Sequence, residues 1–301
     1  MGRAAGRALI AAPPRFSQFV AIDWSGQAVE RPKGIAVAQA GIGAEAPVLL
    51  QPARGWSRSG VVDWLMDHAT ARTNMLVGMD LSFGLPFEDR GAFFPGWPKS
   101  PPTAEELWRQ IDDACIDDPH LGVGSFLRRP AIARYFRHQR AEGDLFGGGT
   151  GRLRRCERRM RDRSALRPSS CFNLVGAGQV GKASLTGMRV LNRLRDVIPV
   201  WPFDPLPAFG PVIVEIYTTI AARAAGLGPG RSKIRDAAAL DDALARLGSA
   251  PHASLTRYDD HATDAIVSAV WLRRHAEDPV LWHPPGLAAV ANTEGWTFGV
   301  T

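Results

Sequence analysis

Two short apolar segments, each with an aspartate at or near its end, constrain the fold of this chain most strongly. Residues 19–23 read FVAID and residues 75–81 read MLVGMDL, and both have the length and composition of buried strands. Three further elements are expected between them: strands at 34–39 and 46–51, and a helix at 59–72 with Ser59 as its N-cap. This βββαβ order predicts an α/β fold that begins with an antiparallel meander.

A fifth strand with an internal acid is expected at 211–218, which reads PVIVEIYT. Two helices are expected after it, at 235–247 and 260–275. Because crossovers between parallel strands are right-handed, the sequence predicts a mixed five-stranded sheet of order 3-2-1-4-5 flanked by helices. Neighbouring strands lie only about 4.8 Å apart, so Asp23, Asp80 and Glu215 should converge at one end of this sheet.

The last expected helix adds more polar side chains near its start. Asp260, His261 and Asp264 are spaced so that all three can project from one patch of the first turn. Carboxylates that close on one point repel each other unless a cation joins them, and such oxygen ligands suit Mg²⁺ or Mn²⁺. Two such ions can activate a water and stabilise the leaving oxygen in phosphodiester cleavage. The expected metal ligands are Asp23, Asp80, Asp264 and Asp260, and the expected catalytic residues are Asp23, Asp80, Asp264, Glu215 and His261.

Each of these residues also has a structural interpretation. Glu215 lies inside an apolar strand, where it either belongs to a site or is locked to a buried arginine. Asp260 can be the N-cap of the last helix, with Asp259 as a turn residue, and His261 can equally satisfy a backbone group. Asp23 could cap a turn, but its position at the end of a buried strand, matched by Asp80, favours a site.

Residues 84–210 are expected to form a helical, arginine-rich insertion, or cap, between two core segments, 16–83 and 211–301, after a flexible arm at 1–15. Its helices are expected at 103–116, 131–142, 152–163 and 182–195. The net charge of the chain is +6, and residues 128–167 hold thirteen arginines against four acids. Such a cluster predicts a polyanionic partner, DNA or RNA, although a solvated arginine surface, a protein-docking surface or a homodimer interface fits it as well. The expected phosphate contacts are Lys182, Arg128, Arg129, Arg154, Arg155 and Arg158.

A glycine-rich stretch at 175–187, VGAGQVGKASLTG, satisfies two nucleotide-binding patterns, G-x-G-x-x-G and G-x-x-x-x-G-K. A phosphate-binding Walker loop needs Ser or Thr after its lysine, whereas Ala183 follows Lys182 here. A dinucleotide site needs a complete second βαβ unit, which the flanking sequence does not supply. We therefore expect no nucleotide cofactor, but a tight turn into a helix whose free N–H groups can receive a backbone phosphate.

Five segments together resemble a known group of proteins. They are VAIDWSG at 20–26, GMDLSFGLP at 78–86, VEIYTTIA at 214–221, DDHATDAIVSA at 259–269 and EGWTFGV at 294–300. The pattern resembles the RNase H-like superfamily, and specifically the predicted RNase H-like nucleases catalogued as domain-of-unknown-function family 429. The resemblance implies that Asp23, Asp80 and Asp264 are the acids of the first strand, the fourth strand and the last helix. The H-x-x-D of His261 and Asp264 is also similar to the last motif of some Holliday-junction resolvases, whereas Thr218 departs from the proline expected after the fifth-strand tyrosine.

The leading function hypothesis is a nuclease that uses Mg²⁺ or Mn²⁺ to hydrolyse phosphodiester bonds of DNA or RNA. The alternatives are a non-catalytic nucleic-acid or protein-binding adaptor on the same fold and, with less support, a nucleotide-dependent phosphotransferase. No apolar run reaches the roughly 18 residues of a membrane span, and a short N-terminal apolar patch at 8–12 does not predict a signal peptide. Cys115, Cys156 and Cys171 are widely spaced, which predicts a reducing, cytoplasmic location without a disulfide framework.

Overall fold

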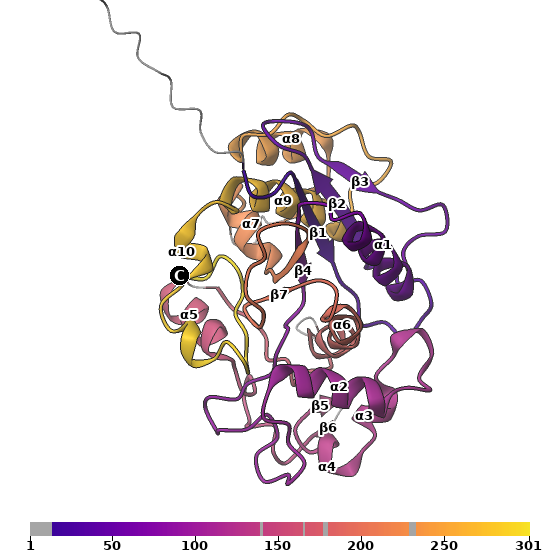
Figure 1. The fold of residues 1–301 in the computed structure, drawn as a ribbon, viewed down its shortest axis with the longest axis vertical. Coiled ribbons are helices and arrows are strands. Elements are labelled where there is room, and N and C mark those ends of the chain that lie inside the picture. Colours follow the sequence, from indigo (N-terminus) through magenta and orange to yellow (C-terminus); the bar gives the residue numbers. More distant parts are fainter. Residues whose placement is uncertain (1–13, 139–140, 165, 177–179, 229–232) are drawn as a thin grey trace, which may run out of the picture.

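A six-stranded mixed sheet lies at the centre of the molecule (Figure 1). The computed structural model describes residues 14–138, 141–164, 166–176, 180–228 and 233–301. The strands are β1 (Gln18–Asp23), β2 (Ala36–Ala40), β3 (Val48–Leu50), β4 (Met75–Asp80), β7 (Val200–Trp201) and β8 (Val212–Glu215), and their order is β3-β2-β1-β4-β8-β7. Strand β2 pairs antiparallel with both β1 and β3, whereas β4, β8 and β7 continue parallel to β1. The predicted α/β class is confirmed, and so is the order of the five expected strands, of which the fifth is β8. Strand β7 makes the sheet one strand wider than expected.

Helices cover both faces of the sheet. One face carries α7 (Thr218–Ala224), α8 (Ala237–Arg246) and α9 (Asp260–His275), and the other carries α1 (Arg58–Thr70) and α6 (Val180–Leu194). Side chains of β1 alternate between the two faces, with Val20 and Ile22 in the hydrophobic cluster of α1 and α6, and Phe19 and Ala21 in that of α9. Among the helices that the structure describes, none is both long and apolar enough to cross a membrane.

Most element boundaries differ from the expected ones by a few residues. Two of the differences change which residue caps a helix. Helix α1 is capped by Ser57, not Ser59, because the Ser57 side chain accepts a hydrogen bond from the Gly60 N–H. Helix α9 is capped by Asp259, which accepts from the Ala262 N–H, so the interpretations of Asp259 as a turn residue and Asp260 as the cap were wrong. Asp260 is thereby free of a capping role.

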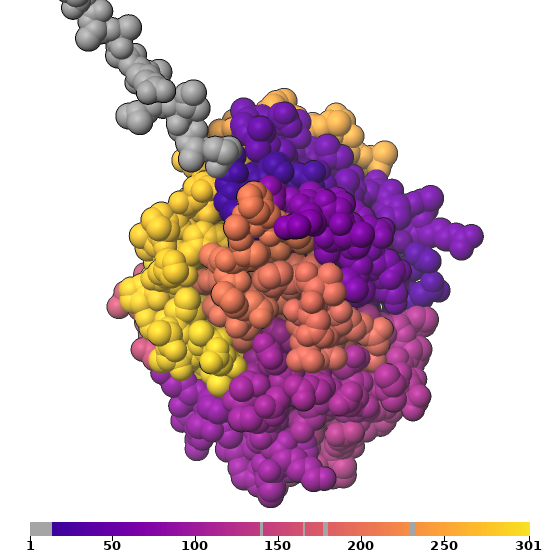
Figure 2. All heavy atoms as spheres, viewed as in Figure 1, coloured from indigo at the N-terminus to yellow at the C-terminus, as the bar shows by residue number. Residues whose placement is uncertain are grey.

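The insertion forms the lower part of the face shown in Figure 2, where it is drawn in purple to magenta. It contains α2 (Ala104–Ala114), η1 (Pro119–Leu121), α3 (Gly124–Leu127), α4 (Pro130–Ala133), β5 (Arg137–His138), β6 (Ala141–Glu142) and α5 (Arg155–Arg163), followed by α6. The helix expected at 131–142 was wrong, since only α4 forms and the Arg137 N–H then donates to the Phe172 carbonyl instead of a helical partner. Phe94 and Trp108 share one hydrophobic cluster with Val20, so the core of the insertion is continuous with the core on this face of the sheet.

The C-terminal segment follows α9, and the described chain begins at residue 14. After the insertion and α9, the C-terminal segment forms α10 (Pro279–Trp282) and η2 (Leu287–Ala289), which lie on one side of the molecule in Figure 1. Of the expected N-terminal arm at 1–15, residues 1–13 lie outside the described part, and Arg15 donates to the carbonyls of Pro207 and Gly210. Arg15 is therefore anchored against the loop before β8.

Candidate active site

Asp23 and Asp80 lie side by side at the carboxyl ends of two parallel strands. In the register of β1 and β4, Asp23 is directly opposite Asp80. Both belong to the alternation that faces α9, because Ala21 lies two residues before Asp23 on that face and Leu76 lies four residues before Asp80. The structure therefore brings these two predicted acids together and directs them toward α9.

The first turns of α9 and α7 add three polar side chains to this pair. His261 Nδ1 lies 3.0 Å from Asp23 Oδ1, and Thr218 Oγ1 donates to Asp80 Oδ2 at 3.1 Å. Asp264, one helical turn after His261, lines the same pocket as Asp23 and Asp80. Three of the predicted site residues on different elements thus meet at one place, together with a hydroxyl that was not predicted.

The electrostatics of this group are those of crowded carboxylates. Burial, followed by the charges of Asp23 and Asp260, raises the pKa of Asp264 to about 7. Burial and the Asp23 charge also raise the pKa of Asp80 well above its usual range. Burial raises the pKa of Asp23 as well, although its hydrogen bond to His261 opposes this, and the same bond raises the pKa of His261. These three carboxyl groups therefore favour either protons or a bound cation.

Asp260 lies at the rim of this group and is paired with exposed cations. Its carboxylate forms ion pairs with Lys233 and, at 2.5 Å, with Arg235. Hydrogen bonds to these two cations hold the pKa of Asp260 below its usual value, despite the opposing effect of partial burial. Because its charge is already compensated, Asp260 is a weaker candidate ligand than Asp23, Asp80 or Asp264.

Glu215 lines the same pocket as the other acids, but its carboxylate is paired with the buried Arg154. In the register of β4 and β8, Glu215 lies opposite Met79, so its side chain takes the face away from Asp80. It is 2% exposed and accepts from Arg154 at 2.5 and 2.7 Å and from the Phe83 N–H at 2.8 Å. Glu157 binds the same guanidinium at 2.9 Å. The buried-arginine interpretation of Glu215 is therefore the correct one.

The same ion pairs remove Arg154 from the predicted phosphate contacts. Arg154 is 1% exposed, and its guanidinium is satisfied by Glu215, Glu157 and the Glu294 carbonyl. Glu294 itself is buried and accepts from the N–H groups of Phe87, Glu88 and Arg155. Glu215 thus joins the insertion to β8, and Glu294 joins it to the C-terminal segment, so Arg154 is not available to bind a phosphate.

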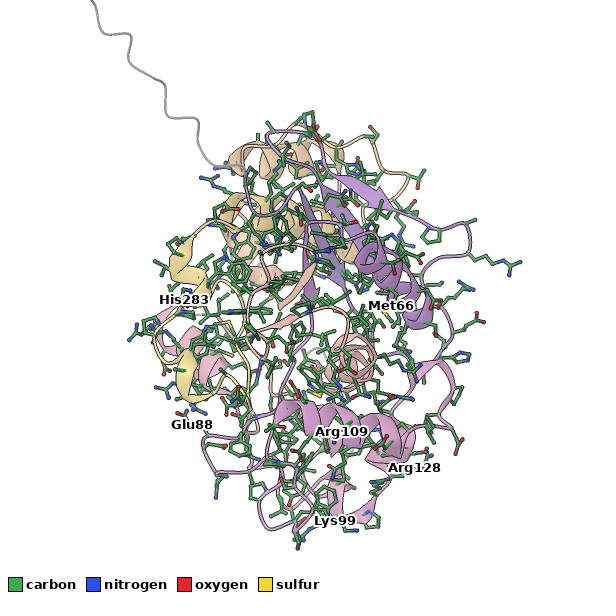
Figure 3. The ribbon with its side chains drawn as sticks, viewed as in Figure 1. Met66, Glu88, Lys99, Arg109, Arg128 and His283 are labelled. Atoms are coloured by element: carbon green, nitrogen blue, oxygen red, sulfur yellow. The ribbon has the colours of Figure 1, made fainter. Side chains whose placement is uncertain are left out.

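The other predicted basic contacts do not form one continuous surface. Arg155 and Arg158 both pair with Glu88. Figure 3 shows Glu88 and Arg128 on opposite sides of the molecule in that view. Arg129 lines a separate shallow depression with Lys99. Of the predicted set, Lys182, Arg128 and the buried Arg154 line the pocket of Asp23, and the Arg128 side chain is 73% exposed.

The loop after β1 is held in place by residues that the sequence did not single out. The buried Arg58 guanidinium donates to the carbonyls of Ser25 at 2.7 Å and Gln27 at 2.6 Å. Trp24 Nε1 donates to Thr186 Oγ1 of α6 at 3.1 Å. The sequence alone does not indicate this arrangement. Arg58 directly follows the N-cap of an amphipathic helix, a position where an arginine is usually exposed.

Helix α6 starts directly against this loop, which explains the glycine-rich stretch in part. A Cβ atom at Gly26 would lie 2.5 Å from the Ala183 nitrogen, and one at Gly181 would lie 2.3 Å from the Cys171 carbonyl oxygen. Both glycines therefore allow a close backbone approach that any side chain would prevent. Gly178, part of the same motif, lies outside the described residues. The stretch seats Lys182 in the pocket wall.

Replacing Gly26 by alanine should lower the free energy of unfolding by about 1–3 kcal/mol, because the added Cβ must displace the first turn of α6. Urea denaturation followed by circular dichroism measures this change. Gly228→Ala is the matched control, since a Cβ there meets no atom within 4 Å. Equal stability of the two variants would contradict the close seating of α6.

The pocket around these residues has a volume of about 890 Å³. The core contributes the acidic wall described above, and the insertion contributes Val123, Leu127, Arg128 and Lys182. Among the described residues, no group of three or more His, Cys, Asp or Glu side chains is already arranged to hold a metal ion. His261 engages one oxygen of Asp23, and Thr218 engages the carboxylate of Asp80 through its hydroxyl and its backbone.

Comparison with models of protein families, with curated proteins and with solved structures finds no match to this chain. The chemistry of the pocket must therefore be inferred from the residues that line it.

Proposed function

We propose that this protein is a Mg²⁺- or Mn²⁺-dependent nuclease that hydrolyses phosphodiester bonds at the pocket of Asp23. The observation that carries the proposal is the juxtaposition of Asp23, Asp80 and Asp264 from two adjacent strand ends and one helix, with His261 bonded to Asp23. The relationship to RNase H-like nucleases remains part of this proposal, supported by the strand order and by these three acids.

The donor set fits a hard divalent cation. Carboxylate oxygens are the ligands that Mg²⁺ and Mn²⁺ prefer, and the raised pKa values of Asp80 and Asp264 show that negative charge at this point lacks compensation. Asp23, Asp80 and Asp264 would hold the ion, with Asp260 as the weaker candidate ligand. When bound, the ion supplies an activated water and neutralises charge on the phosphate.

His261 is suited to move a proton. Its hydrogen bond to Asp23 places the proton of the neutral ring on Nδ1, so the lone pair lies on Nε2. The side chain of His261 is 47% exposed, and a Cβ at the neighbouring Gly34 would lie 3.1 Å from Nε2. The absence of a side chain at Gly34 therefore leaves Nε2 open to accept a proton from water or to donate one to a leaving oxygen.

The direct test measures metal binding and hydrolysis in parallel. Isothermal titration with Mn²⁺ should detect binding that Asp80→Asn and Asp264→Asn weaken, and an oligonucleotide should be cleaved only when Mg²⁺ or Mn²⁺ is present. Asp113→Asn, at an exposed position of α2, is the control and should change neither result. A folded protein that binds no divalent ion and cleaves no single-stranded, duplex, hybrid or branched substrate would refute the nuclease and favour the adaptor.

Without divalent ions, the melting temperature should fall as the pH rises from about 5 to 8, and Mg²⁺ should restore it at pH 8 but not at pH 5. The folded pKa of Asp264, about 7, lies above the unfolded value, so its protonated form stabilises the fold. This stabilisation is complete below about pH 4 and is lost as the pH rises through 7. Asp80 acts in the same direction.

Three histidines change stability in the opposite direction over part of this range, because burial lowers the pKa of His68, His138 and His275. The comparison of wild type with Asp264→Asn removes their contribution. The variant should show a flatter pH profile and a smaller response to Mg²⁺ in differential scanning fluorimetry. An identical profile in both proteins would contradict the assigned environment of Asp264.

A further inference from the structure

The insertion closes over the acidic wall and limits what can reach it. From the insertion, the pocket is lined by the turn after η1 and by α3, represented by Val123 and Leu127, and by the first turn of α6 with Lys182. Pro168 and Ser169 line it from the segment after α5. The acids therefore lie inside a pocket shared by core and insertion, not on an open face of the sheet.

The size of this pocket is that of a small-molecule site. Its volume of about 890 Å³ lies within the range of roughly 300–1,000 Å³ that encloses ligands of drug size. Such a space holds on the order of one or two nucleotides. A base-paired strand carries its partner strand and stacked neighbours with it, and unstacking a base costs a few kcal/mol. A flexible single strand meets neither obstacle.

The chemistry of the walls also suits a single strand. Lys182 and Arg128 provide positive charge for backbone phosphates, and the Lys182 ammonium is close enough to His138 to reinforce the lowering of its pKa by burial. The half-buried Tyr217 offers an aromatic surface in the same pocket, behind which Trp24 is buried. A basic track combined with aromatic surface is the usual means of holding unpaired nucleotides without reading their sequence.

We propose that the substrate is single-stranded nucleic acid, of which one or two nucleotides enter the pocket, with Lys182 binding a phosphate next to the scissile bond. This inference rests on the proposed nuclease function and narrows its substrate. Duplexes, DNA–RNA hybrids and branched junctions should be poorer substrates, because their paired nucleotides must be unstacked before one or two of them can enter the pocket.

The test compares one labelled 20-nucleotide DNA as a single strand, as a duplex and as a hybrid with RNA, in Mg²⁺ or Mn²⁺. The single strand should be hydrolysed with a kcat/KM at least 100-fold higher than the other two. Comparable rates, or a preference for duplex or hybrid, would overturn the substrate assignment and leave the nuclease standing. Bis(p-nitrophenyl) phosphate, a small diester, reports the chemistry separately. Its hydrolysis without cleavage of any strand would also overturn the assignment.

Binding separates the two proposals when nothing is cleaved. Fluorescence anisotropy without metal should show tighter binding of the single strand than of the duplex. If no substrate is cleaved, this result would still support the assignment of the pocket to single strands, although the proposed nuclease activity would be refuted. Lys182→Ala should weaken single-strand binding by about tenfold and reduce the slope of log K against log salt by about 1. Lys99→Ala changes a lysine of the separate depression described above (Lys99 is labelled in Figure 3); it is the matched control and should bind as wild type. Equal effects of the two variants would overturn the role of Lys182.

Discussion

Replacement of Asp23 by asparagine should lower the kcat of phosphodiester hydrolysis by about 10³-fold or more, without loss of the folded state. Asp23 is the acid that touches both parts of the proposed machinery, since it adjoins Asp80 in the sheet and holds Nδ1 of His261. Asparagine keeps the volume but removes the charge, and several kcal/mol of lost transition-state stabilisation corresponds to roughly three orders of magnitude. Single-turnover rates on a single-stranded oligonucleotide measure the loss.

Two controls distinguish this result from a folding defect. Asp63→Asn changes an exposed acid of α1 and should leave the rate unchanged. Loss of the Asp23 charge should also lower the pKa of both Asp264 and His261, because that charge raises both pKa values in the wild type. NMR titration of His261 can follow this shift. Full activity of Asp23→Asn, with metal still required, would show that the acids serve another purpose.

The central acid pair could be predicted because its signal is local and repeated. FVAID and MLVGMD each combine a buried strand with a terminal acid, and right-handed crossover rules place the two strands next to each other. The spacing of His261 and Asp264 in the last helix likewise depends only on helical geometry. Such features can be predicted without any knowledge of the tertiary contacts.

Glu215 could not be assigned in this way, because the decisive quantity is a strand register. A shift of one residue between β4 and β8 reverses the face that a side chain takes. The sequence shows an acid in an apolar strand, but only the structure shows that Glu215 lies opposite Met79 and not opposite Asp80. Thr218 was overlooked for a related reason, since the strand was expected to continue to this residue, whereas α7 begins there and directs the hydroxyl to Asp80.

The arginine-rich segment shows the limit of counting charges. Thirteen arginines at 128–167 predict a polyanion surface. Several of them are instead committed to partners inside the protein, such as Arg152, which binds Asp89 at 2.7 Å and the carbonyls of the loop around it. Long-range pairing of this kind has no sequence period, so burial and charge must be known together before a phosphate contact is assigned.

The strongest test of these internal ion pairs is the substitution Arg154→Met, which removes the arginine that Glu157 and Glu215 share. It should reduce the free energy of unfolding by about 3–5 kcal/mol. The substitution leaves Glu157 and Glu215 buried, each 2% exposed, without their shared counter-charge. Arg155→Met is the matched control at the next position, where the side chain is 39% exposed and pairs with Glu88 at the surface. It should cost less than about 1 kcal/mol. Guanidinium denaturation of both variants measures the difference.

A triple variant, Arg154→Met with Glu157→Gln and Glu215→Gln, should recover more than half of the stability that Arg154→Met loses. The reason is that most of the single-variant cost comes from the two uncompensated carboxylates and not from lost packing. If Arg154→Met were instead as stable as Arg155→Met while binding single-stranded DNA more weakly, Arg154 would be a phosphate contact and the ion-pair assignment would be wrong. Because an unfolded variant also fails to bind nucleic acid, binding by Arg154→Met must be measured at a temperature where the variant is fully folded.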